Sequence, residues 1–236
     1  MRVKRGSAEP DSFTPFELMT FQFTYFSTLA LAIGLLTSCG NSGLTVIPKS
    51  RINAIAHARE TKRESFQVAG PSSQLMSAAI GKPRDKHGMP VYAFSERQRI
   101  ARTTAYTCSE DDHLIYGSKN ATGTNLRYTN RVRSAAADWS FYPVGTTFRI
   151  KGLPYLYVVD DYGSALTGTG TIDIYKPNKE TMNIWGRRNV EVQIVQWGSF
   201  ARSVQILSER TGYEHCRRML ANIVRQQPSL ASVAKR

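Results

Sequence analysis

The stretch YLYVVDDYGSALTGTGTIDIY, residues 155–175, decides the fold of this 236-residue chain. Two short apolar runs, Tyr155–Val159 and Thr171–Tyr175, enclose a turn that is rich in glycine. Short β-type runs separated by turn residues predict neighbouring strands of a small sheet. An aspartate lies at each junction of strand and loop, Asp161 after the first run and Asp173 within the second.

A third aspartate, Asp138, follows three alanines and precedes the turn at Pro143. An aspartate in an apolar β-type run is costly to bury unless it is paired, hydrogen-bonded or protonated. Three such positions in one segment predict a shared carboxylate pocket. Carboxylates with separated pKa values are the groups that cleave glycosidic bonds.

The same strand pattern continues on both sides of this stretch, without a long helix between the strands. Closely spaced short strands of this kind predict a small barrel or sandwich over residues 99–198. The expected strands are Thr103–Cys108, Thr124–Tyr128, Arg131–Ala136, Thr146–Lys151, Tyr155–Val159, Thr171–Tyr175 and Asn189–Trp197. In residues 199–236, apolar spacing predicts helices at Ser203–Glu209 and Glu214–Gln227, and we expect them to pack on the barrel.

The N-terminal part carries the features of an exported lipoprotein. Phe26–Leu36 is an apolar run of signal-peptide length, too short to span a bilayer. It leads into Leu-Thr-Ser-Cys, which matches a lipobox with Cys39 as the lipidated residue. We therefore expect a signal peptide over residues 1–39 and a lipid anchor in the cell envelope. Gly40 favours the periplasmic face of an outer membrane.

Residues 40–98 mix Ser, Gly, Pro, Lys and Arg without a sustained apolar period, which predicts a disordered, flexible linker between anchor and barrel. A short helix around Ile52–Glu64 is the one regular element that we expect there.

The formal net charge of +13 invites a nucleic-acid interpretation, but its distribution argues against one. Lys and Arg outnumber Asp and Glu by 13 to 7 in residues 1–100 and by 11 to 4 in 176–236, whereas residues 101–175 hold 7 of each. The central segment has no basic helix with interleaved aromatics. Basic flanks near an anionic membrane or wall polymer explain the charge, and we expect no nucleic-acid partner.

The chain has three cysteines, and a lipidated Cys39 leaves Cys108 and Cys216. Outside the cytoplasm an even pair suggests a disulfide, whereas two separate buried thiols are the alternative. The pattern leaves both open.

Six ordered motifs resemble the 3D (Asp-Asp-Asp) domain family, over about residues 103–197. They are Thr104–Thr107, Ala121–Gly123, Ser134–Asp138, Pro143–Thr146, Asp161–Gly168 with Ile172–Tyr175, and Trp185–Arg188. The family is similar to the C-terminal barrel of membrane-bound lytic transglycosylase A. The resemblance implies a mainly β fold, a six-stranded double-psi β-barrel. Two departures, Ser164 for a family glycine and Thr167 for a family lysine, weaken the expectation of activity.

The resemblance also implies the chemistry, cleavage of the β-1,4 bond between N-acetylmuramic acid and N-acetylglucosamine in peptidoglycan, with a 1,6-anhydromuramyl product. No metal or other cofactor is implied. Asp161 or Asp173 is the expected acid/base and Asp138 the partner that tunes pKa or orients substrate. A non-catalytic peptidoglycan-binding module and a hydrolase of another β-glucan are the alternatives.

Each candidate also has a structural interpretation. Asp138 could cap its turn, and Asp173 could face solvent. Asp160 is interpreted as a solvated neighbour of Asp161, although the pattern leaves open that the two aspartates exchange roles. The substrate-binding candidates include ordinary strand formers; they are Tyr106, Thr122, Tyr162, Gly163 and Ser164. We expect Trp185 to pack in the barrel, and the polar cluster Glu110–His113 to be a solvated loop rather than a metal site.

Overall fold

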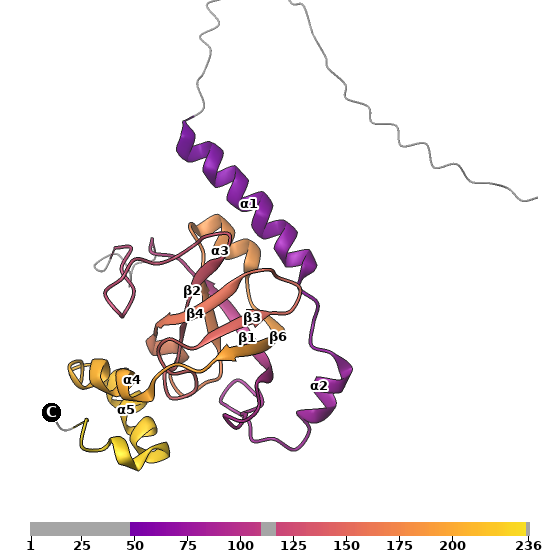
Figure 1. The fold of residues 1–236 in the computed structure, drawn as a ribbon. Coiled ribbons are helices and arrows are strands. Elements are labelled where there is room, and N and C mark those ends of the chain that lie inside the picture. Colours follow the sequence, from indigo (N-terminus) through magenta and orange to yellow (C-terminus); the bar gives the residue numbers. More distant parts are fainter. Residues whose placement is uncertain (1–47, 110–116, 235–236) are drawn as a thin grey trace, which may run out of the picture. The chain divides into compact units, whose positions relative to one another are not determined.

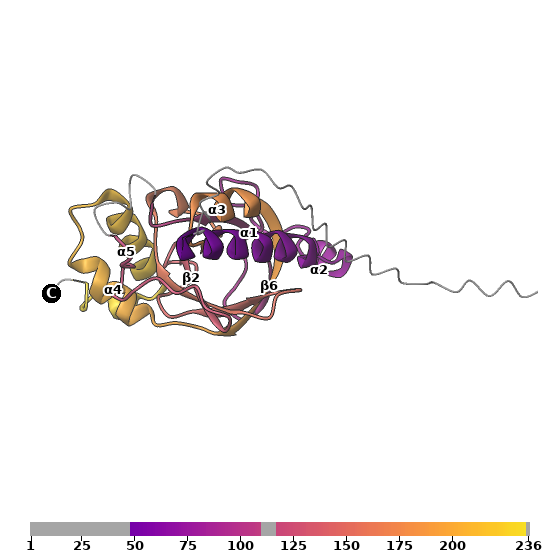
Figure 2. The same cartoon turned by 90° about the horizontal axis from the view of Figure 1, so that it is seen from above.

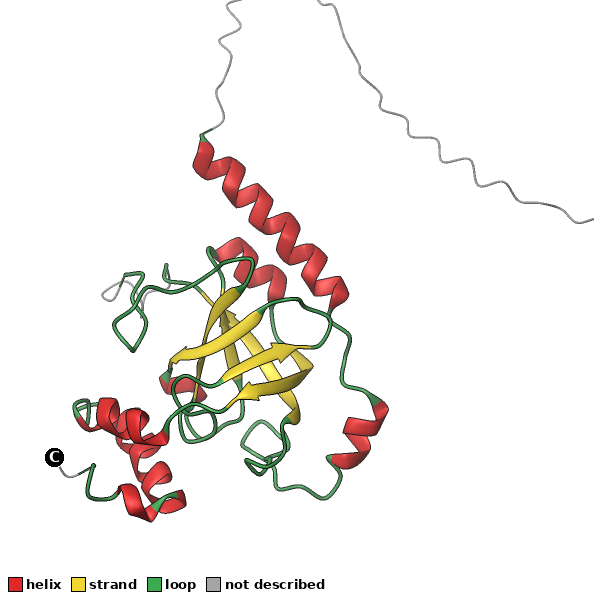
Figure 3. Cartoon of the chain, viewed as in Figure 1, coloured by secondary structure: helices red, strands yellow, loops and turns green. Residues whose placement is uncertain are grey.

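The computed structural model describes residues 48–109 and 117–234, all within one compact unit that spans Val46–Arg236. Six strands form a closed barrel in the order β1-β5-β2-β4-β3-β6. Helices lie around the outside of these central strands (Figure 3). The strands are β1 Gln98–Tyr106, β2 Val132–Ala137, β3 Thr147–Ile150, β4 Leu156–Asp161, β5 Ile172–Tyr175 and β6 Arg188–Gln196. The fold class expected from the sequence, a six-stranded barrel with C-terminal helices, is confirmed.

Alternation of buried apolar and exposed residues is clearest in β6. Val190, Val192 and Ile194 of β6 are fully buried, whereas Gln193 and Val195 between and beyond them are exposed. Such a period of two is the geometry of a strand with one face on the core. Two parallel pairs, β1 with β5 and β2 with β4, are combined with antiparallel neighbours.

The expected C-terminal helices are present as α4 Phe200–Ser208 and α5 Glu214–Gln226, which pack on each other (Figure 1). Val204 and Leu207 of α4 and Met219 and Ile223 of α5 are fully buried in the core cluster of the barrel. These four side chains are among those that the helical spacing singled out.

The helix expected around Ile52–Glu64 is present, but residues 48–98 are more ordered than the expected flexible linker. They form α1 Lys49–Gln67 and α2 Ser73–Ala78, and α1 packs beside α3 Lys179–Trp185 at one end of the barrel (Figures 1 and 2). Two of its side chains, Thr61 and Glu64, are fully buried. This segment has no sustained apolar period because the side chains of α1 that are buried against the barrel are a hydroxyl and a carboxylate rather than apolar groups.

One expected strand is absent, and the alternative that the cysteines left open is decided. The strand expected at Thr124–Tyr128 is absent from the described residues and is replaced by isolated bridges, Lys119 to Asn125 and Tyr128 to Arg133. Cys108 and Cys216 are free cysteines, so the thiols are separate, but only Cys216 is buried and Cys108 is half-buried. Cys108 lies 3.6 Å from the Tyr175 hydroxyl, whereas Cys216 is buried in α5.

Candidate functional site

A β-bulge in β4 turns two consecutive aspartates toward the outside of the barrel. The register passes from Ala135 opposite Val159 to Ala136 opposite Asp161, so Asp160 is the extra residue. Bulges disrupt the ladder locally and re-aim side chains, and they are enriched beside active sites. The Asp160 Oδ2 atom accepts a hydrogen bond of 2.8 Å from Ser134, on the outer face of β2.

Asp161 holds the loop that crosses this face. Its Oδ1 accepts hydrogen bonds from the backbone N–H groups of Ala121, at 3.1 Å, and Tyr162, at 3.0 Å. Its Oδ2 accepts from the Tyr106 hydroxyl at 3.1 Å. With 6% of its surface exposed, Asp161 is an anchor for neighbouring groups.

Asp173 lies in the same transverse row of the barrel. The register places Thr104 of β1 opposite Asp173, Asp173 opposite Ala136, and Ala136 opposite Asp161. Two strand spacings separate the Cα atoms of Asp161 and Asp173, about 10 Å. The Thr104 hydroxyl donates to Asp173 Oδ1 at 2.7 Å, and the Asp173 side chain is half-buried. A substrate can therefore reach this carboxylate.

The Tyr106 hydroxyl donates to Asp161, and the charges of Asp160 and Asp173 also act on it. Burial raises the pKa of Tyr106 well above its ordinary value, and the charges of Asp161, Asp160 and Asp173 raise it further, in that order. Tyr106 therefore stays protonated and donates its hydrogen bond. Asp160, Asp161 and Asp173 are the trio that the fold gathers.

Asp138, the third aspartate of the sequence hypothesis, has a different environment. Its Oδ1 accepts from the backbone N–H of Ser140 at 2.7 Å and from the Ser140 hydroxyl at 2.6 Å. Its Oδ2 accepts from the backbone N–H of Gly168 at 2.6 Å. It is fully buried, and this burial raises the pKa of its carboxyl although the three hydrogen bonds oppose the rise. These contacts are those of a residue that holds two turns together.

The sequence interpretation of Asp160 as a solvated neighbour is wrong, because only 3% of Asp160 is exposed. Burial raises the pKa of its carboxyl to about 6, with Asp161 adding to the rise and Ser134 and Arg127 opposing it. Its Oδ1 has no hydrogen-bond partner among the described residues. A buried carboxylic acid with a pKa near neutrality is the kind of group that transfers protons.

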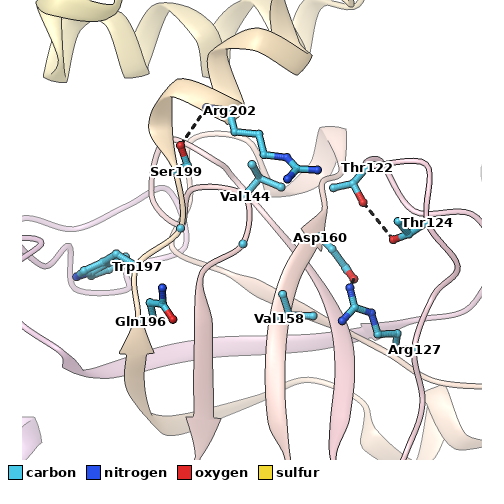
Figure 4. Close-up of a pocket in the computed structure, with 12 residues that line it drawn as sticks. Thr122, Thr124, Arg127, Val144, Val158, Asp160, Gln196, Trp197, Ser199 and Arg202 are labelled. Carbon is cyan, nitrogen blue, oxygen red and sulfur yellow. Dashed lines mark hydrogen bonds and ion pairs between the residues drawn. The ribbon is translucent and has the colours of Figure 1, made fainter.

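Asp160 lines a cavity of about 420 Å³ (Figure 4). Thr122 and Arg127 form one wall, and Trp197 and Arg202 lie on the other side, where β6 leads into α4. The guanidinium of Arg127 is 3.9 Å from Asp160. Thr122, a predicted substrate-binding residue, therefore lies at this cavity. Sequence reasoning gave no site role to Ser134, although it begins one of the six motifs, and it missed Arg127 and Arg202, which nothing in the local pattern distinguishes from ordinary surface residues.

The other predicted binding residues lie elsewhere. Tyr162 makes an edge contact with Trp139, and its hydroxyl accepts a hydrogen bond of 2.9 Å from Arg210. Gly163 precedes a short 3-10 helix that Ser164 begins, and neither lines the cavity beside Asp160. Trp185 is fully buried, as expected.

Residues 48–109 and 117–234 contain no group of three or more His, Cys, Asp or Glu side chains placed to hold a metal ion. No helix within these ranges is long and apolar enough to cross a bilayer. The cluster Glu110–His113 and the lipobox at Cys39 lie outside the described residues.

Comparison with known proteins confirms the resemblance drawn from the motifs. Residues 133–196 match the 3D domain, from the start of β2 to the end of β6. The putative cell wall shaping protein YabE of Bacillus subtilis (strain 168) is 31% identical over 93 residues. That alignment covers 39% of this chain and 22% of YabE, so the chain spans about a fifth of the length of that relative.

Proposed function

We propose that this protein acts on the glycan strands of peptidoglycan, as a lytic transglycosylase of the cell envelope. The match to the 3D domain and the similarity to a protein named for cell wall shaping support a role at the wall. The observation that carries the proposal is the register row that brings Asp161 and Asp173 to one face of the barrel, where the Tyr106 hydroxyl donates to Asp161 and Asp160 precedes it at the bulge.

The reaction needs one carboxyl group that serves first as acid and then as base. Its proton passes to the glycosidic oxygen as the bond from that oxygen to the muramic C1 breaks. The resulting carboxylate then accepts the proton of the C6 hydroxyl while O6 bonds to C1, which forms the 1,6-anhydro ring. Atoms and charges balance without water or a cofactor.

We assign the acid/base to Asp173, because this role requires direct contact with the glycan. Asp173 is half-buried, whereas Asp160 and Asp161 are 3% and 6% exposed. The Thr104 hydroxyl orients the Asp173 carboxylate. Asp161 and Tyr106 are positioning residues, and Asp160, with its raised pKa, is the second candidate for the proton transfer.

Product analysis tests this function. Peptidoglycan purified from a diderm is digested with the full chain, and the soluble fragments are identified by mass spectrometry. We expect muropeptides with 1,6-anhydromuramyl ends. Fragments with free reducing ends would instead identify a hydrolase, and the absence of soluble fragments would contradict cleavage.

A non-catalytic glycan-binding module on the same barrel is the second candidate. Ser164 and Thr167, which replace a glycine and a lysine of the resembling family, favour it. Sedimentation with insoluble peptidoglycan that Asp173→Asn leaves unchanged, without release of muropeptides, would support binding alone.

We also propose that Cys39 anchors the protein in the cell envelope through lipid. The apolar run before Cys39 and the lipobox support this. Metabolic labelling with a fatty acid should mark the wild-type chain and leave Cys39→Ser unmarked. Equal labelling of the two would contradict the anchor.

A further inference from the structure

Helix α1 carries three exposed apolar side chains on the face that points away from the barrel. Ile52, Ile55 and Phe66 expose 52%, 45% and 81% of their surface. Residues three, four, seven and eleven apart share one side of a helix, so these three positions follow a single stripe. A monomer gains nothing in water from such a stripe, because exposed apolar area is unfavourable.

Cations alternate with these apolar tips along the same face, since Arg59 is seven residues from both Ile52 and Phe66. The exposed basic residues of α1 are Lys49, Arg51, Arg59, Lys62 and Arg63. The two acidic residues of the helix, Glu60 and Glu64, contact the barrel instead. The outward face therefore combines apolar tips with positive charge and presents no carboxylate.

We propose that the outward face of α1 binds the surface of an anionic phospholipid bilayer. Helices that lie in the membrane interface bury an apolar stripe among the headgroups while lysine and arginine meet the phosphates. The apolar residues favour a bilayer over an anionic wall polymer. Such a polymer can pair with the cations, but it has no apolar interior in which Phe66 could be buried.

The inner face of α1 fixes the orientation of the barrel on that surface. Glu64 accepts hydrogen bonds from Arg133 at 2.7 Å and from Lys176 at 2.8 Å, and Glu60 accepts from Arg133 at 2.8 Å. Arg133 and Lys176 are 1% and 0% exposed. Binding through α1 therefore positions the barrel together with the helix.

This orientation turns the candidate site away from the membrane. Arg133 lies opposite Tyr157 near the start of β2 and β4, whereas Asp160 lies near the end of β4. Three residues along a strand span about 10 Å. Membrane binding is independent of the proposed function; only the consequence, an active site that faces the wall, depends on it.

The test uses the full chain with one environment-sensitive fluorophore at Ala56→Cys, on the exposed side of α1, in a Cys39→Ser and Cys108→Ser background. A second sample carries the label at Tyr213→Cys, exposed before α5. Each is mixed with phosphatidylcholine vesicles, with or without phosphatidylglycerol, that contain a nitroxide lipid as quencher. We expect the fluorophore at position 56 to be quenched by vesicles that contain phosphatidylglycerol and not by vesicles of phosphatidylcholine only. Salt should reduce this quenching. The fluorophore at position 213 should not be quenched by either vesicle type.

Matched charge variants identify the surface. The double variant Arg59→Gln, Arg63→Gln should lower the vesicle partition coefficient, measured by quenching, about tenfold or more. The double variant Arg217→Gln, Arg225→Gln on α5 should leave this coefficient unchanged. The apolar run at Phe26–Leu36 is common to all samples and cannot produce this difference. Three results would overturn the proposal: equal quenching on both vesicle types, quenching at position 213, or a charge effect on sedimentation with purified peptidoglycan but not on vesicles.

Discussion

Buried charge is arranged differently under α1 and at the aspartate end of the barrel. Under α1, the Glu64 carboxylate lies between Arg133, at 2.7 Å, and Lys176, at 2.8 Å. At the other end, the equally buried Asp160 is 3.9 Å from Arg127, and its Oδ1 lacks a hydrogen-bond partner among the described residues. Closely paired charges fix how two elements dock, whereas a poorly compensated carboxylate has a shifted pKa that chemistry can use.

The largest loss of stability should follow from breaking the α1 clamp, the ion pairs of Glu64 with Arg133 and Lys176. Glu64→Ala leaves two buried cations without their shared partner, and we expect the free energy of unfolding to fall by about 3–5 kcal/mol. Denaturant unfolding followed by circular dichroism measures it. The exposed Glu209→Ala should stay within about 0.5 kcal/mol of wild type. Equal effects of the two changes would contradict the clamp.

A backbone change tests the cavity end. A Cβ on Gly198 would clash with the carbonyl oxygens of Pro143 and Val144, so Gly198→Ala should cost about 1–3 kcal/mol or more. Gly212→Ala meets open space and serves as the control, with a change of about 0–1 kcal/mol toward higher stability. Thermal unfolding compares them, and a neutral Gly198→Ala would show that this segment is free to move.

Removal of the buried, poorly compensated charge of Asp160 should stabilise the barrel. The folded pKa of Asp160, about 6, is above its ordinary 3.8, so the folded state binds more protons between these values and stability falls as pH rises through them. Asp160→Asn should therefore raise the free energy of unfolding at pH 7 by about 1–3 kcal/mol. This gain should disappear below about pH 4. Stability curves against pH check it, and a pH-independent difference would argue against the raised pKa.

The smallest change in the free energy of unfolding is expected for Tyr106, whose hydroxyl donates to Asp161. Tyr106→Phe removes the hydroxyl that donates to Asp161 and should cost about 1–2 kcal/mol. Tyr213→Phe, on an exposed tyrosine, is the control. A cost no larger than that of the control would mean that the Tyr106 hydroxyl does not hold Asp161.

The elements whose bounds the sequence predicted most closely are those with apolar periodicity. β6 and α5 appear within a residue of their expected positions because Val190, Val192 and Ile194, and Met219 and Ile223, follow the strand and helix periods. Helix α3 was missed, although Asn178 caps it by accepting a hydrogen bond from the Thr181 N–H.

The site was predictable in part. The motif order identified Asp161 and Asp173, which the register places in one row with Ala136. The role of Asp160 could not be read from the pattern, since only the bulge in β4 decides where its side chain points. The extent of α1 was hidden for a related reason, because its buried face is polar and its partners, Arg133 and Lys176, are distant in the sequence.

The most direct measurement is the rate of anhydromuropeptide release by Asp173→Asn, compared with wild type, Asp160→Asn and the exposed control Glu180→Gln. We predict a loss of about 10²–10⁴-fold for Asp173→Asn, with normal folding and normal sedimentation with peptidoglycan. Glu180→Gln should match wild type. Wild-type release by Asp173→Asn would contradict the assignment, and a selective loss in Asp160→Asn would move the proton transfer to Asp160.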